Sequence, residues 1–587
     1  MSLSKALTAA AGNAGGAGES LYVEDVFSTY LYTGNSTARD ITNGIDLSGE
    51  GGLVWGKVRA NGDHYLRDTE RGGSEFLSSN SASASSTVDT YPIGNGTAFN
   101  SDGFSIGPGG AVNGNGFNFT SWTFRKAEKF FDVVTYTGDG NNNRQVAHSL
   151  GSTPHFILVK SLGFSASWYA LHYDGSSWTS LVLNSTAAGS SASGGIWGDG
   201  SSFVAPTDTD FTIANFGSVN ASGYSFVAYL FASDAGGFGD DESIIKCGSY
   251  TGTGAAGLEV DLGFEPQFLL VKNASAVENW GMFDSTRAEG ALYPNTSGAE
   301  VGGEYYFNHS QASGYFKPTA TGFICDGTNG AWNGSGQTHI YIAIRRPMKT
   351  PESGTEVYTP YLPTVYEDPY WKSSFSVVDF VLGRWNTNTS VENILAFDRL
   401  RGSGVALETN TTDSEIGAAG DSSSYISNMV FDKMYGFHTT TTFSPSTPDL
   451  ALMFKRATGF FDVVAYTGDG TSSRNINHNL GVTPELIIYK SRSDGTRSWI
   501  VWQKDLNSEY VSNDFYLKLE SSNGVAGSNF WNAPPTSSTF QLSGDASDNE
   551  INGNGQTYIA YLFATLAGVS KVGSYTGTGS NVDVDCG

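Results

Sequence analysis

One stretch of this chain is written twice with a single change. "FFDVVTYTGDG" begins at Phe130 and "FFDVVAYTGDG" begins at Phe460, so that only Thr135 is replaced, by Ala465. The agreement continues without a gap into the next turn and the apolar run behind it, "HSLGSTPHFILVK" against "HNLGVTPELIIYK". Self-similarity at a fixed period is the signature of a chain built from repeated structural units.

Further copies complete the pattern. "YTGTGAAGLEVDLG" begins at Tyr250 and "SYTGTGSNVDVDCG" begins at Ser574, while Asn and Gly three residues apart recur at Asn113, Asn220, Asn333 and Asn552. The repeats predict an Ala/Gly-rich lead-in, five modules and the start of a sixth. These are 1–19 (lead-in), 20–127 (module 1), 128–240 (module 2), 241–348 (module 3), 349–457 (module 4, like 1), 458–568 (module 5, like 2) and 569–587 (truncated sixth module, like 3). We expect the natural polypeptide to continue this sixth module.

Composition and pattern favour an all-β fold. The chain contains 74 Gly, 36 Phe and 29 Tyr, which suit turns and strands, and long amphipathic helix patterns are hard to find. "FDVVTY" predicts a strand that enters the "TGDG" turn, and "HFILVK" predicts a strand buried on both faces or at the centre of a sandwich. We therefore expect tandem β-sandwich or jelly-roll-like modules of about 105–115 residues in an elongated array.

Charge and cysteine content exclude several classes of partner. The formal net charge of −26 would repel a phosphate backbone, so we expect no nucleic acid partner and no binding to anionic membranes. The start carries no apolar signal segment, and no run approaches the ~18 apolar residues that span a bilayer, which predicts a chain made in a cytoplasm without membrane insertion. Cys247, Cys325 and Cys586 fit no zinc spacing and are interpreted as small buried apolar side chains.

Three stretches carry a resemblance to a known group of proteins: "FFDVVTYTGDG…HSLGSTPHFILVKS", "WTFRKAEKFFDVV" and "FNSDGFSIG". They resemble the repeated β-modules of marine bacteriophage virion proteins, in particular cyanophage tail-fibre and appendage proteins. The resemblance implies a structural protein of the tail or another surface appendage, assembled in the host cytoplasm and used in host attachment. It also implies other virion or tail proteins as partners, a homo-oligomer (a trimer by family), and a lead-in at 1–19 that attaches to the particle. It supplies no catalytic residues.

Three tryptophans in Gly- or Asn-rich loop sequence are the candidate contact residues. They are Trp197 in "GGIWGDG", Trp332 in "GAWNGSG" and Trp531 in "SNFWNAPP". An exposed indole could stack on a sugar or dock a neighbouring subunit, and it could equally fold back onto its own core. No acid pair of the kind that cleaves glycosides stands out. We expect no cofactor, no metal and no catalytic residue.

Recurring polar residues receive structural interpretations. His148 recurs at His478 without a matching nucleophile, so we expect packing or a turn hydrogen bond. Asp and Arg stand three residues apart in three modules, where we expect a charge-assisted hydrogen bond to lock a turn. These pairs are Asp68/Arg71, Asp284/Arg287 and Asp398/Arg401. "DGNNN" at Asp139 is faintly like a calcium loop, but its sister at Asp469 is "DGTSS", so a turn is the preferred interpretation.

Repetition itself bears on function. Copying a unit lengthens a molecule without a new folding problem, which suits a fibre or stalk better than an enzyme with one site. The leading hypothesis is a non-enzymatic bacteriophage virion appendage protein. The alternatives are a multivalent lectin or adhesin on host surface polysaccharide, and a tailspike-like polysaccharide depolymerase.

Overall fold

The computed structural model describes residues 21–87, 99–239, 242–287, 290–302, 306–310, 315–363, 369–384, 393–417, 429–439, 450–506, 515–527, 530–543 and 549–586. Antiparallel strands make up almost all of the regular structure, which confirms the all-β prediction. Within the described ranges, each named sheet takes its strands from a single one of the five spans that the repeats define. The predicted lead-in at 1–19 lies outside the described residues.

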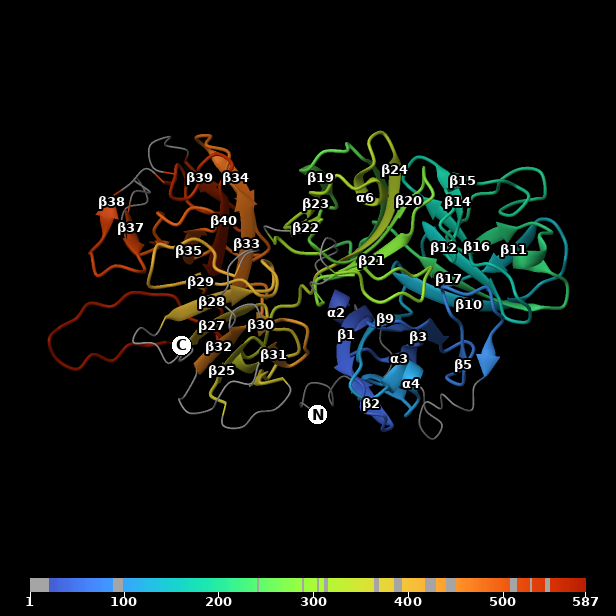
Figure 1. The fold of residues 1–587 in the computed structure, drawn as a ribbon, viewed down its shortest axis with the longest axis horizontal. Helices are drawn as coiled ribbons and strands as arrows, with labels where there is room; N and C mark the ends of the chain where they lie inside the picture. Colours follow the sequence, from blue (N-terminus) through green and yellow to red (C-terminus); the bar gives the residue numbers. More distant parts are fainter. Residues whose placement is uncertain are drawn as a thin grey trace, which may run out of the picture.

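Modules 1 and 3 share one topology, in which a four-stranded sheet faces a three-stranded sheet (Figure 1). In module 1 the sheet orders are β1 (Phe27–Thr33), β9 (Asn118–Arg125), β3 (Gly52–Val58), β4 (His64–Asp68), and β2 (Arg39–Thr42), β8 (Gly103–Ile106), β7 (Phe99–Asn100), with a small pair β5 (Glu75–Phe76) and β6 (Ser86–Thr87). In module 3 they are β18 (Ile245–Thr251), β24 (Thr338–Arg345), β20 (Pro266–Asn273), β21 (Trp280–Asp284), and β19 (Leu258–Asp261), β23 (Gly322–Cys325), β22 (Phe316–Thr319).

Modules 2 and 5 repeat this plan with a longer main sheet of six strands and a second sheet of two. In module 2 the orders are β10 (Phe131–Thr137), β17 (Ser225–Phe231), β12 (Phe156–Ser161), β13 (Tyr169–Tyr173), β14 (Trp178–Val182), β15 (Ser190–Ser191), and β11 (Arg144–Ala147), β16 (Asp210–Ile213). In module 5 they are β33 (Phe461–Thr467), β40 (Thr557–Phe563), β35 (Leu486–Ser491), β36 (Ile500–Gln503), β37 (Phe515–Lys518), β38 (Ala526–Gly527), and β34 (Arg474–Asn477), β39 (Thr539–Leu542).

Module 4 is the fifth copy of the plan. Its main sheet has the order β25 (Tyr358–Tyr361), β32 (Leu450–Phe454), β27 (Phe380–Arg384), β28 (Ile394–Asp398), β29 (Leu407–Glu408), and its second sheet has the order β26 (Trp371–Lys372), β31 (Gly436–Thr439), β30 (Met429–Val430). Residues 571–586, which repeat the opening of module 3, form no strand.

The helices are short, and three of them end at the recurring Asn. In modules 1–3 a single helical turn stands before the last strand of the main sheet and ends at that Asn, as α4 (Gly110–Asn113), α5 (Gly217–Asn220) and α6 (Gly330–Asn333). The other helical turns are α2 (Val23–Val26), α3 (Leu47–Glu50) and η2 (Gly354–Glu356). None of the helices in the described ranges has the length and apolar character needed to cross a membrane.

The recurring Asn ties the turn after the first strand to the last strand. Asn220 is buried, and its Oδ1 accepts a hydrogen bond from the Asp139 backbone N–H at 3.0 Å. Its Nδ2 donates to Asp139 Oδ1 at 3.1 Å and to the Asn141 carbonyl at 2.8 Å. Asn552 makes the same three contacts around Asp469 in module 5. The "YTGDG…N" pattern is therefore one hydrogen-bonded clamp.

Each module has its own core between its two sheets. In module 1, Ile41 of β2 and Phe104 of β8 in the smaller sheet pack with Val54 of β3 and Phe119 of β9 in the larger one. Modules 3, 4 and 5 have separate clusters of the same kind, whereas the interior of module 2, with Val146 of β11 and Phe211 of β16, is continuous with the cluster that modules 1–3 share. These clusters explain the alternation of apolar residues that the sequence shows, because one face of every strand points into the sandwich.

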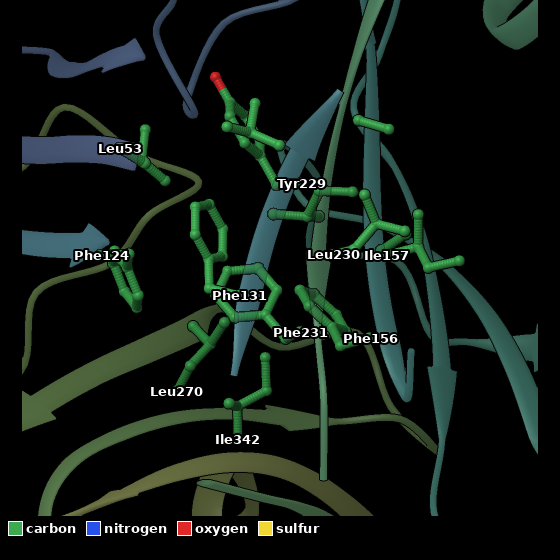
Figure 2. Close-up of a cluster of buried hydrophobic side chains, with 14 of the residues drawn as sticks. Leu53, Phe124, Phe131, Phe156, Ile157, Tyr229, Leu230, Phe231, Leu270 and Ile342 are labelled. Atoms are coloured by element: carbon green, nitrogen blue, oxygen red, sulfur yellow. The ribbon is translucent and has the colours of Figure 1, made fainter. Parts of the chain in front are cut away.

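The main sheets are buried on their second face as well. Every residue of β3, β12 and β20 is buried, as predicted for β12 from its continuous apolar run. The second faces of modules 1, 2 and 3 meet in one shared hydrophobic cluster. Figure 2 shows Phe124 from module 1, Phe131 and Phe231 from module 2, and Leu270 and Ile342 from module 3 gathered at this centre.

The modules therefore form two groups and do not follow one another in a simple line. Modules 1–3 surround the shared cluster in one lobe, and modules 4 and 5 form the other lobe, in yellow to red (Figure 1). This arrangement differs from the expected array of independent modules. The reason is that the outer face of each main sheet is apolar. A sheet with two apolar faces must be covered on both.

We predict that Asn220→Ala lowers the free energy of unfolding by about 2–4 kcal/mol, because a buried side chain that makes three hydrogen bonds to the turn at Asp139 is removed. Denaturant unfolding followed by tryptophan fluorescence measures the loss. Asn115→Ala, at an exposed position of the same kind of motif in module 1, should change the value by less than ~0.5 kcal/mol. Equal losses in the two variants would contradict the clamp.

Candidate functional site at the module junctions

The Asp–Arg pairs lock turns, as predicted. Asp68 Oδ1 accepts the Arg71 backbone N–H at 2.9 Å, and Asp68 Oδ2 accepts Arg71 Nε at 2.6 Å. Asp284/Arg287 and Asp398/Arg401 repeat this geometry with both side chains fully buried. Each Arg also donates to a backbone carbonyl two residues before its Asp. The turn is therefore fixed at several points.

The same carboxylates are reached from a neighbouring module. Tyr229 of module 2 donates its hydroxyl to Asp68 of module 1 at 2.7 Å. Tyr561 of module 5 donates to Asp398 of module 4 at 2.8 Å. Trp122 of module 1 donates its indole N–H to Asp284 of module 3 at 3.1 Å. A hydrogen bond to a buried charge is among the stronger ones in proteins.

Burial determines the protonation of these donors. It raises the pKa of Tyr229 and of Tyr561 well above the ordinary value of 10, despite the nearby Arg side chains. Both phenols therefore remain donors at neutral pH. The Asp–Arg–aromatic group is a buried, hydrogen-bonded unit that joins modules 1 and 2, modules 1 and 3, and modules 4 and 5. We call these three contact regions, together with the region where modules 2 and 3 meet, the junctions.

A second contact recurs at every junction. A ring N–H at the start of the fourth main-sheet strand, or just before it, donates to a backbone carbonyl of the neighbouring module. That carbonyl belongs to the residue after a Leu that has the same position in all four modules. The four cases are Trp168 to Ser78 (2.9 Å), Trp280 to Val182 (3.2 Å), His64 to Tyr293 (3.1 Å) and Trp499 to Glu408 (2.9 Å). Three of these rings are indoles, and the fourth is an imidazole that Trp55 contacts from its other side at 3.1 Å.

A third contact is a pair of backbone hydrogen bonds that run in opposite directions. Between modules 1 and 2 these are Ala166 to Ala82 and Ser85 to Leu162; between 2 and 3, Glu278 to Thr186 and Gly189 to Ala274; between 3 and 1, Gly62 to Ser297 and Glu300 to Arg59. Between modules 4 and 5 the Glu415 N–H donates to the Arg492 carbonyl at the same position. Because these bonds use only the main chain, they set the spacing of the modules whatever the local side chains are.

Buried lysines add to three of the junctions. The recurring Lys just before the last residue of β12, β20 and β35 donates to a carbonyl of the neighbouring module, from Lys160 to Ala82, from Lys272 to Thr186 and from Lys490 to Thr412. Burial lowers the pKa of each of them to about 8. At neutral pH each lysine is a cation held by backbone oxygens.

The order of these contacts closes a ring. Module 2 donates to module 1 through Trp168, module 3 donates to module 2 through Trp280, and module 1 donates to module 3 through His64. Heterologous contacts of this kind either close on themselves or run on without end. Here they close after three modules, whereas modules 4 and 5 make one junction of the same kind through Trp499.

The three candidate tryptophans are buried, so the interpretation of them as exposed sugar-binding or docking rings is wrong. Trp197, Trp332 and Trp531 are 0%, 1% and 5% exposed. Trp197 donates to Ser180 Oγ at 3.1 Å, and Trp531 donates to Tyr489 Oη at 3.2 Å. All three lie in hydrophobic clusters, because folding back removes far more apolar area from water than a loop position suggests.

The remaining polar predictions have local outcomes. His148 and His478 each accept a backbone N–H two residues on through Nδ1 at 3.3 Å, which confirms a turn role. Asp139 serves the Asn220 clamp and its own turn. In the part of the chain that the structure describes, no group of three His, Cys, Asp or Glu could hold a metal ion. Cys247 and Cys325 are buried as predicted, whereas Cys586 is exposed.

A cleft of about 410 Å³ lies where modules 1, 3 and 4 meet. Its charged lining is joined in a network that links the two lobes. Glu265 of module 3 takes both guanidinium NH groups of Arg456, each at 2.7 Å, and Arg456 reaches Asp462 at 2.8 Å. Arg346 also pairs with Glu265 at 3.2 Å. The geometry is that of a structural ion-pair network that connects modules 3, 4 and 5.

Sequence reasoning found the Asp–Arg turns and missed their aromatic partners. The signal was present, because Trp122, Tyr229 and Tyr561 occupy the same position in the last strands "TSWTF", "VAYLF" and "IAYLF". An aromatic at a fixed place in repeated units points to a shared contact. The sequence alone does not say that the contact lies in another module.

We predict that Tyr229→Phe lowers the free energy of unfolding by about 1.5–3 kcal/mol, because only the hydroxyl that donates to the buried Asp68 is removed. Tyr561→Phe should lose a similar amount through Asp398. Tyr224→Phe, which changes a half-exposed ring of module 2, is the matched control and should lose less than ~0.5 kcal/mol. Denaturant unfolding measures all three, and a silent Tyr229→Phe would contradict the junction.

The ring of modules 1–3 should lose stability in mild acid. Burial lowers the pKa of His64 to about 3 and that of His172 to about 4, and both side chains meet module 3 carbonyls. The unfolded chain takes up these protons below about pH 6.5 and the folded chain does not. Stability is therefore complete above pH 6.5, and each His costs about 1–2 kcal/mol between pH 7 and pH 5.

The replacement residues for the test are those that modules 4 and 5 have at the equivalent positions. The register of module 4 places Ile394 where module 1 has His64, and that of module 5 places Gln503 where module 2 has His172. The double change His64→Ile with His172→Gln should reduce the loss of stability between pH 7 and pH 5 by about 2–4 kcal/mol, and the pH dependence that remains comes from other buried rings such as His309, whose pKa burial also lowers to about 3. An unchanged slope would contradict the assignment of that slope to these two rings.

Comparison with known families matches residues 23–347 and 454–586 to one model, described as a domain of unknown function (DUF7483). The first matched segment spans modules 1–3, which is one closed ring. No curated protein and no solved structure matches the chain. The matched segments cover well over half of the chain, and the protein therefore belongs to the DUF7483 family.

Proposed function

We propose that this chain is a non-enzymatic structural protein of a bacteriophage particle, part of a tail fibre or another surface appendage used in host attachment. The observation that supports the proposal is that the recurring polar residues form contacts between modules. The Asp–Arg turns, the buried lysines and the ring N–H groups hold modules to one another. Chemistry that an enzyme would place in a cleft is here placed between sandwiches.

The resemblance of "FFDVVTYTGDG" and its companions to phage appendage modules supplies the biological setting of the proposal. A virion part must keep its shape through assembly and release, and a closed ring of sandwiches with buried ion pairs suits that demand. The acidic surface, with a formal net charge of −26, favours a chain that does not aggregate before assembly. Other virion proteins and further copies of the chain are the partners proposed.

The two alternatives receive less support from the site. A lectin needs exposed aromatic faces, and the three candidate tryptophans are buried. A depolymerase needs a pair of carboxyl groups free to work on a sugar. Glu265 and Asp462 line a second cleft, but both carboxylates form ion pairs in the network that links the two lobes. Arg456 contacts both of them, and Arg346 contacts Glu265.

We predict that the chain is found in washed particles of the virus that encodes it, and that antibody raised against it labels a tail or surface appendage in negative-stain images. Mass spectrometry of the particles and immunolabelling are the two measurements. A glycan array and an assay for reducing sugar released from host polysaccharide test the alternatives. Absence from particles together with sugar binding or sugar release would overturn the proposal.

A further inference from the structure

The outer sheet face of modules 1 and 2 is covered by module 3. Phe268 of module 3 packs against Phe27, Trp122 and Phe124 of module 1, with ring centroids 5.6, 6.0 and 6.3 Å apart. Trp280 of module 3 packs against Phe156 of module 2 at 6.3 Å. This contact is what completes the burial of the shared cluster.

Modules 4 and 5 carry the same face. Strand register makes the comparison residue by residue: Phe454 pairs with Tyr358 and Phe380 as Phe124 pairs with Phe27 and Leu53. Seven apolar side chains at covered positions of modules 1 and 2 have apolar counterparts here. The counterparts are Tyr358, Leu382, Leu452, Phe454, Leu486, Ile488 and Phe563, at the positions of Phe27, Trp55, Trp122, Phe124, Phe156, Leu158 and Phe231.

The seven residues of modules 1 and 2 and their seven counterparts differ in how far they are buried. Each of the seven residues in modules 1 and 2 is at most 4% exposed, whereas all seven counterparts are only partly buried. The rim differs further. Leu519 is 47% exposed where Leu183 is fully buried, and Ile394 is 47% exposed where His64 is 1% exposed. We call the seven counterparts, with Ile394 and Leu519, the open face of modules 4 and 5.

The open face is made of nine apolar side chains, and the junction between modules 4 and 5 sets their relative positions. Contiguous exposed apolar patches of this kind mark interaction sites on folded proteins. The counterpart surface in modules 1 and 2 takes one kind of occupant, a β-module that presents the apolar residues of β20, β21 and β24. The same register and the same junction between modules 4 and 5 favour the same kind of occupant.

Residues 569–587 point to that occupant. "KVGSYTGTG" from Lys571 repeats "KCGSYTGTG" from Lys246, which forms β18 of module 3. In the described residues 571–586 no strand forms, and Tyr575 is 73% exposed where Tyr250 is 7% exposed. In module 3 these stretches are strands because β18 pairs with β24 and β19 pairs with β23. The opening of such a module cannot form its sheets without those partner strands.

We propose that the open face of modules 4 and 5 binds a β-module of the module 3 type, the one that residues 569–587 begin, and that this module closes a second ring. Its counterparts of Phe268, Leu270 and Ile342 cover Leu452, Phe454 and Phe563. The fit of the family model to modules 1–3 as one segment agrees with a ring of three as the unit.

The test supplies the occupant on the full chain. Residues 1–587 are followed by a second copy of residues 264–348, so that the sixth module is completed with module 3 sequence. Leu452→Cys, made in a Cys586→Leu background that restores the residue of module 3 at the position of Leu262, reports on the open face through its rate of alkylation by a maleimide. Val277→Cys, at a position 71% exposed in module 3, is the control. The extension should slow labelling at Leu452→Cys at least tenfold and leave Val277→Cys unchanged.

A matched variant separates docking from general folding. Changing Phe268 and Leu270 to Asp in the appended copy alone should restore fast labelling at Leu452→Cys. Labelling that stays fast in the extended chain would overturn the proposal, and so would an appended copy that remains unfolded by circular dichroism, because docking should drive its folding. If Leu452→Cys is already protected in residues 1–587 and light scattering shows a dimer, the face pairs two copies of the chain and the proposal is wrong.

Discussion

A buried carboxylate that serves two modules is the interaction on which this structure depends. Asp68 and Asp398 each fix an Arg three residues on and receive a hydroxyl from the next module, and Asp284 does the same with an indole N–H. A buried charge is costly unless its hydrogen bonds are complete. The turn therefore reaches its full stability only when the neighbouring module is in place, which couples local folding to assembly of the ring.

The two-faced main sheet explains why modules do not stand alone. One face of β3, β12 or β20 belongs to its own sandwich, and the other belongs to the shared cluster of modules 1–3. Apolar burial of this second face supplies the free energy, at roughly 25 cal/mol per Å². The backbone hydrogen bonds and the Asp turns supply the register. Strength and specificity thus come from different groups at the same junction.

Local features could be predicted from the sequence, and contacts between modules could not. The all-β class, the Asp–Arg turns and the role of His148 depend on residues close together in the chain, so pattern and turn chemistry found them. The partners Asp68 and Tyr229 lie 161 positions apart, and no pattern within one module points from one to the other. The position of Trp197 was left open between an exposed loop and the core for a related reason, since loop composition does not show which loop folds over its own core.

Two features determine where further modules can be added to such a chain. They are the closed ring of modules 1–3 and the contacts that join the two lobes. Once His64 meets module 3, every main sheet of the first ring is covered, and a further module finds no second face there to occupy. The chain continues instead through the Glu265–Arg456–Asp462 network, which ties module 3 to modules 4 and 5 with charged groups and not with an apolar face. The two groups of modules are thus joined by polar contacts. The first group has a covered core without help from the second, because modules 1–3 bury the second faces of their main sheets against one another.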